Sequence, residues 1–370
     1  MLSRIFGFLQ KFDWMLFLFT VILTVIGLAS IYGIDLSRTG GGSFFPTQLL
    51  AFGLGVGVLF FLAVFHKSFF EKYAKFFYLG TLIILVAVLF FGVDVRGTRG
   101  WFRLFGFSFQ PAELAKLVLI LYLGYFVTKQ RRRFDRFSFV FFSGVVAFIP
   151  VMLILMQPDL GSSLVLLGIW FGILLLCRTK KRYVLSIVLV GLLTFAAGWL
   201  FLFQDYQKER LLTFVDPGRD PLGSGYNVTQ SVIAVGSGQL FGRGLGFGSQ
   251  SQLRFLPEAQ SDFIFSVIAE ELGFVGVVIV LGLYGGIFWR IFVLTEHCKD
   301  DFSVFVLLGA LLYLLTQLSV NIGAAIGVMP LTGIPLPFLS YGGTSLIINY
   351  SLIGIIQSIV ITSKKLGSYL

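Results

Sequence analysis

The sequence has 370 residues, of which 57% are hydrophobic and only 12% are charged, and its formal net charge is +10. Soluble domains carry about twice this charged fraction, and one soluble core could not bury so many apolar side chains. Two histidines leave almost no material for a histidine-based metal site or a serine–histidine triad, and the two cysteines are interpreted as structural or incidental. The chain is therefore expected to lie mostly in lipid, with any chemistry resting on carboxylates, lysines and arginines.

Ten apolar runs are long enough to cross a bilayer, which takes about 20 residues. In chain order they are Trp14 to Ile34, Phe45 to Phe65, Tyr73 to Val93, Pro111 to Val127, Phe139 to Met156, Ser162 to Cys177, Tyr183 to Phe203, Phe263 to Val293, Ser303 to Ile322 and Ser345 to Thr362. No small-residue cleavage site follows the first run, so we expect it to be a retained span. The predicted fold class is all-α: a polytopic integral membrane protein of about ten transmembrane helices, with residues 1–370 as a single membrane domain.

Basic residues indicate the orientation of these helices. With the N-terminus inside, most of the 28 lysine and arginine residues fall in connections on the inner side, which is the bias that cytoplasmic loops show. The positive charge therefore reports topology, and no nucleic-acid partner is expected. The pattern predicts a multi-pass membrane protein with both termini in the cytoplasm.

Three connections on the outer side are unusual. The one from Gln204 to Asp262, residues 204–262 between the seventh and eighth helices, is far longer than an ordinary loop, and such loops are usually functional or disordered. Because apolar residues alternate there with glycine-rich turns, we expect an ordered loop of short helices and re-entrant pieces. The other two run from Asp94 to Gln110 and from Met329 to Thr344. Three ordered outer loops that converge on one face would form a pocket.

Ionisable residues inside spans are candidates for function because each costs roughly 2.5 to 3.5 kcal/mol to insert. Glu113 and Lys116, three residues apart, share a helix face and can neutralise each other near the outer end of the fourth span. The alternative is a structural ion pair that holds helices together. Asp159 lies in a tight outer turn before the sixth span, where N-capping of that helix is an equally good explanation.

Asp262 ends the long outer loop directly before a long apolar helix. One interpretation is an N-cap with a favourable helix-dipole interaction. The other is a carboxylate at the membrane–water boundary, where lipid headgroups and polar substrates meet. Glu270 shares the helix face of Asp262 because the two are eight residues apart. We expect Glu270 to be either a buried hydrogen-bonding strut or a support for Asp262.

Nine cations lie in the outer connections, against the usual bias, which indicates an anionic ligand such as a phosphate group. Anchoring to lipid headgroups is the alternative explanation. Glycine-rich stretches at 236–238 and 242–246 could add backbone N–H groups to a phosphate site, but glycine is common in membrane loops and this signal is weak.

Several ordered motifs together resemble the shape, elongation, division and sporulation (SEDS) family of peptidoglycan glycosyltransferases. They are Gly100-Trp101; Gln110-Pro111-Ala112-Glu113-Leu114-Ala115-Lys116; Gln157-Pro158-Asp159-Leu160-Gly161-Ser162-Ser163; Asp216-Pro217 with Asp220-Pro221-Leu222-Gly223-Ser224-Gly225-Tyr226; Gln230-Ser231; Gly236-Ser237-Gly238; Leu256-Pro257-Glu258; Asp262-Phe263-Ile264-Phe265; Ala269-Glu270-Glu271-Leu272-Gly273; Asn321-Ile322-Gly323; and Thr332-Gly333-Ile334-Pro335-Leu336-Pro337-Phe338 with Ser340-Tyr341-Gly342-Gly343. The resemblance covers essentially the whole chain. Within the family, the short termini and the run from Gly248 to Leu253 look more like the elongation enzyme RodA than its division relative FtsW.

The resemblance implies an activity at the outer face of the bacterial cytoplasmic (inner) membrane during cell elongation. Lipid II, a disaccharide-pentapeptide on undecaprenyl diphosphate, would be polymerised into β-1,4 glycan strands. The family's proposed catalytic aspartate maps onto Asp262. Because a diphosphate-linked donor already has a good leaving group, one base suffices for inverting attack by the acceptor's 4-hydroxyl. We therefore expect Asp262 to be that general base.

The other expected site residues would serve the substrate: Lys116, Glu113, Arg210, Arg96, Arg99, Arg103, Asp159 and Glu258. Lys116, Arg210 and one of the other three arginines would contact phosphate, with Glu113 positioning Lys116. Glu258 and Asp159 would have supporting roles. A divalent cation, Mg²⁺ or Mn²⁺, would suit diphosphate chemistry, although the sequence offers no dedicated cage, and no organic cofactor is expected. The resemblance also implies a class B penicillin-binding protein, a monofunctional transpeptidase, as partner, together with other elongation-complex membrane proteins.

Two other classes of function stay open. A lipid II flippase or transporter would use Glu113, Lys116 and Asp159 to line a translocation path, although no inverted internal repeat is visible. A structural scaffold would need these charges only for packing. Within the family, the FtsW-type division paralogue is the alternative.

Overall fold

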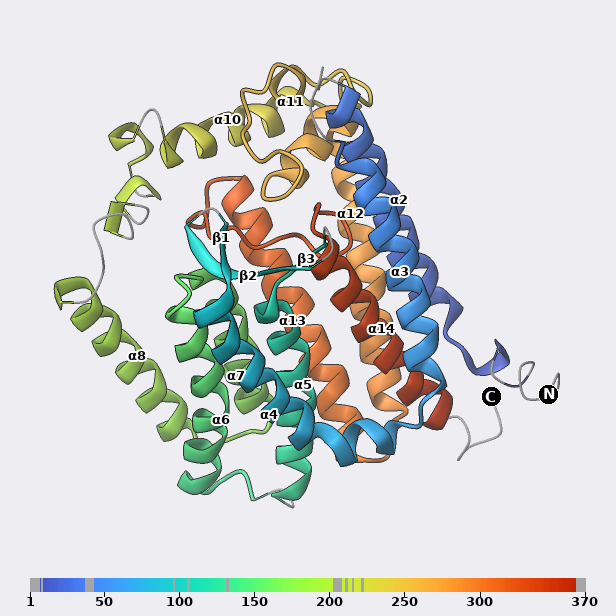
Figure 1. The fold of residues 1–370 in the computed structure, drawn as a ribbon, viewed down its shortest axis with the longest axis vertical. Helices are drawn as coiled ribbons and strands as arrows, with labels where there is room; N and C mark the ends of the chain where they lie inside the picture. The colour runs from blue at the N-terminus through green and yellow to red at the C-terminus, as the bar shows by residue number, and fades with distance from the viewer. Residues whose placement is uncertain are drawn as a thin grey trace.

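The computed structural model describes residues 7, 9–36, 43–95, 97–104, 107–130, 133–201, 208–209, 212–214, 216–220 and 223–363 (Figure 1). Its long helices are α2 (Trp14–Leu36), α3 (Phe45–Val64), α4 (Lys67–Phe91), α5 (Pro111–Lys129), α6 (Phe137–Leu155), α7 (Leu160–Leu176), α8 (Lys181–Phe201), α12 (Ile264–Glu296), α13 (Asp301–Ala325) and α14 (Gly343–Ser363). In these ranges, 9 helices are long and apolar enough to span a membrane, and the apolar α7 is slightly shorter at 17 residues. The predicted multi-pass helical fold of about ten spans is therefore confirmed.

Local sequence signals set where several helices begin. Proline occupies the first turn of α3 and of α5, where its missing N–H has no intrahelical partner to lose. The side chains of Asp159 and Asp300 accept hydrogen bonds from backbone N–H groups in the first turns of α7 and α13. Charged and polar residues thus terminate the apolar runs at the positions where free N–H groups need acceptors.

Helices α5 and α14 form the centre of the bundle, and α8 lies apart from it (Figure 1). Glycines permit close approach at the central contacts. A Cβ atom on Gly354 of α14 would lie 2.7 Å from the carbonyl oxygen of Leu59 in α3. One on Gly124 of α5 would lie 2.8 Å from a methyl group of Val306 in α13. In α8 the only buried residue is Gly198, so its apolar side chains face the surroundings. A helix that is apolar all round and unburied is consistent with contact to lipid.

A small antiparallel sheet lies between α4 and α5, and it was not predicted. Strands β1 (Val93–Val95), β2 (Thr98–Leu104) and β3 (Phe107–Phe109) are ordered β1-β2-β3. The long connection after α8 contains η1 (Pro217–Arg219), α10 (Ser224–Ser237) and α11 (Ser249–Gln252). The expectation of short helices in this connection is confirmed for the part of the chain that is described.

Helix α12 is broken at Gly273, where the sequence predicted one uninterrupted span from Phe263 to Val293. Gly273 has φ 67° and ψ −164°, a conformation that residues with a side chain rarely adopt. A Cβ atom there would lie 2.2 Å from the backbone nitrogen of Gly242. The N–H groups of Phe274 and Val275 donate instead to the carbonyl oxygens of Gln239 and Leu240. The break therefore lets the long outer connection dock onto the helix.

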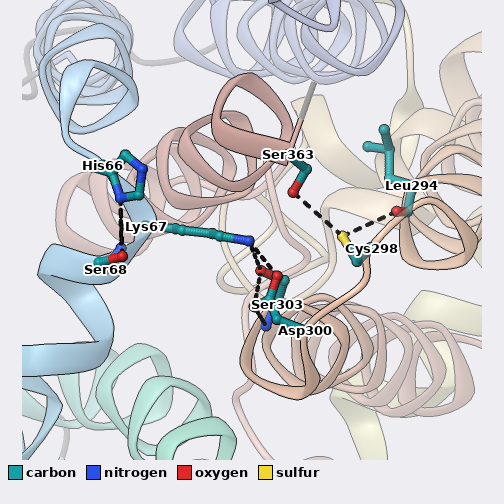
Figure 2. Close-up of polar contacts among 8 residues, drawn as sticks. All are labelled: His66, Lys67, Ser68, Leu294, Cys298, Asp300, Ser303 and Ser363. Atoms are coloured by element: carbon teal, nitrogen blue, oxygen red, sulfur yellow. Dashed lines mark hydrogen bonds and ion pairs between the residues drawn. The ribbon is translucent and has the colours of Figure 1, made fainter. Parts of the chain in front are cut away.

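Ion pairs tie the helix ends together at the end of the bundle opposite the sheet. Figure 2 shows Lys67, at the start of α4, reaching Asp300 and Ser303 at the start of α13. Arg290 of α12 donates from Nε to the buried carboxylate of Asp13 at 2.7 Å. Burial by itself would raise the pKa of Asp300, but hydrogen bonds from Lys67 and Ser303 outweigh burial and hold that pKa below its usual value. The charged form of Asp300 is therefore favoured in the folded protein.

Candidate active site

Asp262 lies at the end of a tight turn that is built by Glu258. Glu258 adopts φ 53°, and its carbonyl oxygen accepts the N–H groups of Ser261 at 3.0 Å and Asp262 at 3.1 Å. The Glu258 carboxylate accepts hydrogen bonds from Gln260 and Ser261. The N-cap position of α12 is occupied by Phe263, so the N-cap interpretation of Asp262 is wrong. Glu258 thus shapes the turn that presents the partly exposed Asp262.

The connection between α13 and α14 holds this turn by hydrogen bonds. Ser340 donates from its hydroxyl to the carbonyl oxygen of Ser261 at 2.6 Å, and the N–H group of Tyr341 donates to Gln260. Asn321, near the end of α13, donates from its amide to the carbonyl oxygen of Asp262 at 3.0 Å. A Cβ atom on Gly333 would lie 3.8 Å from the Asp262 carboxylate, so Gly333 lies directly beside this carboxylate.

The sheet and the turn before α7 contact the same group of outer segments. Thr344 donates to the carbonyl oxygen of Ser108 in β3 at 2.6 Å. A Cβ atom on Gly161 would lie 2.7 Å from the carbonyl oxygen of Thr332. Gln110, just before α5, donates to Asp159 at 3.1 Å. The predicted convergence of outer connections is confirmed for these segments, which surround the Asp262 turn.

The outer segments that surround the Asp262 turn are called the rim below. Glu113 and Lys116 form a buried ion pair on the inner side of this rim. Lys116 Nζ lies 2.7 Å from Glu113 Oε1, and the two side chains are only 1% and 2% exposed. The predicted neutralisation of the two charges is confirmed. Because Lys116 is enclosed, its ammonium group does not reach the surface in this structure, and its expected contact with phosphate stays a prediction.

The remaining predicted residues fall in different places. Asp159 caps α7 by accepting the N–H group of Ser162 at 2.9 Å, as the capping interpretation predicted. Arg99 and Arg103 are exposed on β2. Arg96 and Arg210 lie outside the described residues. The phosphate contacts expected of the four arginines are therefore not tested.

Glu270 and Glu271 hold the long outer connection against α12. Glu270 accepts hydrogen bonds from the backbone N–H groups of Gln250 at 2.9 Å and Ser251 at 3.3 Å, and Glu271 accepts that of Gly246 at 3.0 Å. The interpretation of Glu270 as a buried strut is confirmed. Glu271 thus accepts a backbone donor of the glycine-rich stretch 242–246, so that end of the stretch already has an anionic partner within the protein.

Within the described ranges there is no cluster of three or more histidine, cysteine, aspartate or glutamate side chains that could hold a metal ion. A hard divalent cation can still be bound mainly through substrate phosphates with one or two carboxylates. Asp262 and Glu258 are two carboxylate residues that share one turn of the outer segments.

Comparison with known proteins assigns the chain to a family. Residues 10–365 match the family of cell cycle proteins that comprises FtsW, RodA and SpoVE. The chain belongs to this family, which is the SEDS family that the motifs indicated. It is 37% identical over 315 residues to the peptidoglycan glycosyltransferase MrdB of Escherichia coli (strain K12), covering 85% of each chain. It is 34% identical over 359 residues to the probable peptidoglycan glycosyltransferase FtsW of Geobacter sp. (strain M18), covering 95% of this chain and 97% of that one.

A solved SEDS-family neighbour has the same fold. A chain of a peptidoglycan synthase complex, from a study of how polymerization and crosslinking are coordinated, superposes with a TM-score of 0.80 at 32% identity, covering 94% of this chain and 97% of that one. Sequence reasoning had missed the roles of Asn321 and Ser340, which fix the Asp262 turn. The available signal was two polar side chains inside or beside an apolar span.

Proposed function

We propose that this chain is a peptidoglycan glycosyltransferase that polymerises lipid II into β-1,4 glycan strands. The observation that carries the proposal is Asp262, a partly exposed carboxylate at the point where four outer segments meet. Its relatives MrdB and FtsW bear the name of this activity, which supports the same activity here. An exposed rim site suits a substrate whose headgroup is polar and whose anchor stays in the membrane.

The chemistry requires one base. Asp262 takes the proton from the acceptor's 4-hydroxyl, the oxygen attacks the anomeric carbon of the donor from the face opposite the diphosphate, and the carbon–oxygen bond to the diphosphate breaks with inversion. The bonding electrons leave with the diphosphate. Cations near the departing group stabilise its charge. The hydrogen bonds to the Asp262 turn hold the base in place before the substrate arrives.

The phosphate contacts are assigned to the residues that the sequence singled out. The exposed Arg99 and Arg103 on β2 are suited to bind phosphate directly. Lys116 and its partner Glu113 act from beneath the rim, and Lys116 reaches phosphate only after a movement that exposes it. Mg²⁺ or Mn²⁺ would enter with the substrate's diphosphate and neutralise the leaving group, with Asp262 and Glu258 as carboxylate ligands.

We place the active site at the outer face of the bacterial cytoplasmic membrane, with both termini in the cytoplasm. The excess of basic residues on the inner side supports this orientation. The partner that we propose is a class B penicillin-binding protein within the elongation complex. The similar chain in a peptidoglycan synthase complex, in which polymerization and crosslinking are coordinated, supports such a partner. Identities of 37% with MrdB and 34% with an FtsW protein are close, so the assignment to elongation rests mainly on the run from Gly248 to Leu253.

A polymerisation assay in detergent micelles separates this function from transport. Purified protein, alone and with its cognate class B partner, is given fluorescent lipid II and Mg²⁺ or Mn²⁺, and products are resolved on a gel. Polymer in micelles supports the glycosyltransferase, because a flippase has no membrane to work across there. Lipid II that moves across vesicle membranes without polymer in either system would favour the flippase.

A further inference from the structure

Four buried polar atoms lie on the facing sides of α5 and α13 without a hydrogen-bond partner among the described residues. They are Glu113 Oε2, both amide atoms of Gln317, and Asn321 Oδ1. The Tyr313 hydroxyl lies beside the Gln317 amide, but not in the geometry of a hydrogen bond. All three side chains are at least nine-tenths buried. Buried polar atoms are normally satisfied, by protein or by ordered water, because leaving them unpaired is costly. Four such atoms in one region therefore indicate a site for a small hydrogen-bonding ligand.

The helix register brings these side chains together. Helices α5 and α13 are antiparallel, and Gly124 packs against Val306 at their far end. Eleven residues are three helical turns, so Glu113 lies on the same face of α5 as Gly124, and Gln317 lies on the same face of α13 as Val306. Glu113 lies three turns closer to the rim than Gly124, and Gln317 lies three turns closer to the rim than Val306. Glu113 and Gln317 therefore face each other across the helix interface.

Asn321 extends this polar row to the Asp262 turn. It follows Gln317 by four residues, one turn of α13, and lies on the same side of the helix. Its amide nitrogen donates to the carbonyl oxygen of Asp262 at 3.0 Å and to that of Ile334 at 2.8 Å. The row therefore runs from the Glu113–Lys116 ion pair, past Gln317, to the backbone of Asp262.

We propose that buried water molecules fill this row and that Gln317 is a positioning residue for the reaction. A water between α5 and α13 donates to Glu113 Oε2 and accepts from the Gln317 amide, and a second joins the Gln317 carbonyl to Asn321. Water has the size and the mixed donor and acceptor character that this set needs. Gln317 thereby holds the Glu113–Lys116 pair and the Asp262 turn in a fixed relation. This role rests on the proposed glycosyltransferase activity, whereas the presence of water does not.

Two equally buried tyrosines allow the water to be tested without any variant. Tyr313 lies one turn before Gln317, with its hydroxyl near both the Gln317 amide and the charge of Glu113, and it donates to Asn349 at 2.9 Å. Tyr284 of α12 is also fully buried, but its hydroxyl is bonded directly to the carbonyl oxygen of Pro337. X-ray radiolysis generates hydroxyl radicals from bound water and labels adjacent side chains. We expect several-fold more label on Tyr313 than on Tyr284, and equal labelling would overturn the water row.

The positioning role is tested by Gln317→Met, which keeps the side-chain length and removes both polar atoms. We expect the Tm to fall and kcat to drop roughly tenfold, with KM almost unchanged, because the reacting groups are misplaced while substrate contacts remain. Leu314→Met, also buried on α13, is the matched control and should leave both quantities unchanged. A higher Tm with wild-type kcat would show that the Gln317 amide makes no stabilising hydrogen bond, and would overturn the proposal while the polymerase assignment stands.

If wild-type protein makes no polymer, the proposed function fails and the positioning role of Gln317 fails with it. The tyrosine labelling still decides whether the water row is present.

Discussion

Removing one partner of the Glu113–Lys116 pair should destabilise the protein strongly. In Lys116→Met the carboxylate of Glu113 stays in a site where its side chain is 2% exposed, and its 2.7 Å bond to the ammonium group is lost. Breaking a buried pair in this way costs about 3–5 kcal/mol, whereas replacing both partners by apolar residues of similar volume is often neutral or stabilising. The double variant Glu113→Met/Lys116→Met should therefore recover most of the stability that the single variant loses.

The same substitution at a more exposed pair is the matched control. Lys67 and Asp300 also form an ion pair, but their side chains are 12% and 39% exposed, so water screens this pair more than the enclosed one and its loss should cost less. Unfolding free energies of the three variants in detergent would be compared with that of the wild type. If Lys116→Met costs no more than Lys67→Met, the reasoning from burial is refuted.

Activity of the double variant then separates the two interpretations of this pair. A stable double variant that makes no polymer would place Glu113 and Lys116 in the reaction. A stable and active one would make them a structural lock, which was the alternative raised by their spacing on one helix face.

Two further predictions concern the helix break and the opposite end of the bundle. Gly273→Ala should destabilise by at least about 1–3 kcal/mol, because φ 67° with ψ −164° suits glycine alone and the new Cβ would lie 2.2 Å from the Gly242 nitrogen. Gly282→Ala, in the same helix with open space around its Cβ, is the control, and equal unfolding free energies for the two variants would contradict the account. Asp300 has a lowered pKa, so its contribution is present above the unfolded value of about 3.9 and is lost as pH falls through the folded value. The difference in unfolding free energy between wild type and Asp300→Asn should therefore become smaller below about pH 4. A difference that does not change with pH would contradict this prediction.

Hydropathy predicted most of the fold because each membrane span needs a long apolar run. The orientation that the basic residues indicate stays a prediction. The break at Gly273 was missed because a single glycine in an apolar run is compatible with a continuous helix. Only the docking of residues 239–246 onto α12 demands its positive φ. The sheet was missed because its strands of three to seven residues give almost no periodic signal.

The site was predictable where local chemistry decides the outcome and not where tertiary contacts do. The spacing of Glu113 and Lys116 predicted their pairing, and the turn before α7 predicted the capping role of Asp159. Asn321 is nearly sixty residues from Asp262, so no local pattern could indicate that it holds the Asp262 turn. The glycine-rich stretch after α10 looked able to bind phosphate, yet Glu271 already accepts a backbone donor from it.

The most direct test of the central claim is lipid II polymerisation by Asp262→Asn, which preserves the shape of the side chain and removes its basicity. Asp135→Asn, at an exposed aspartate in the connection before α6, is the control. Asp262 as general base predicts full-length polymer from the wild type and the control, and a loss of at least about 100-fold in rate from a folded Asp262→Asn protein. Wild-type rates from Asp262→Asn would contradict that assignment.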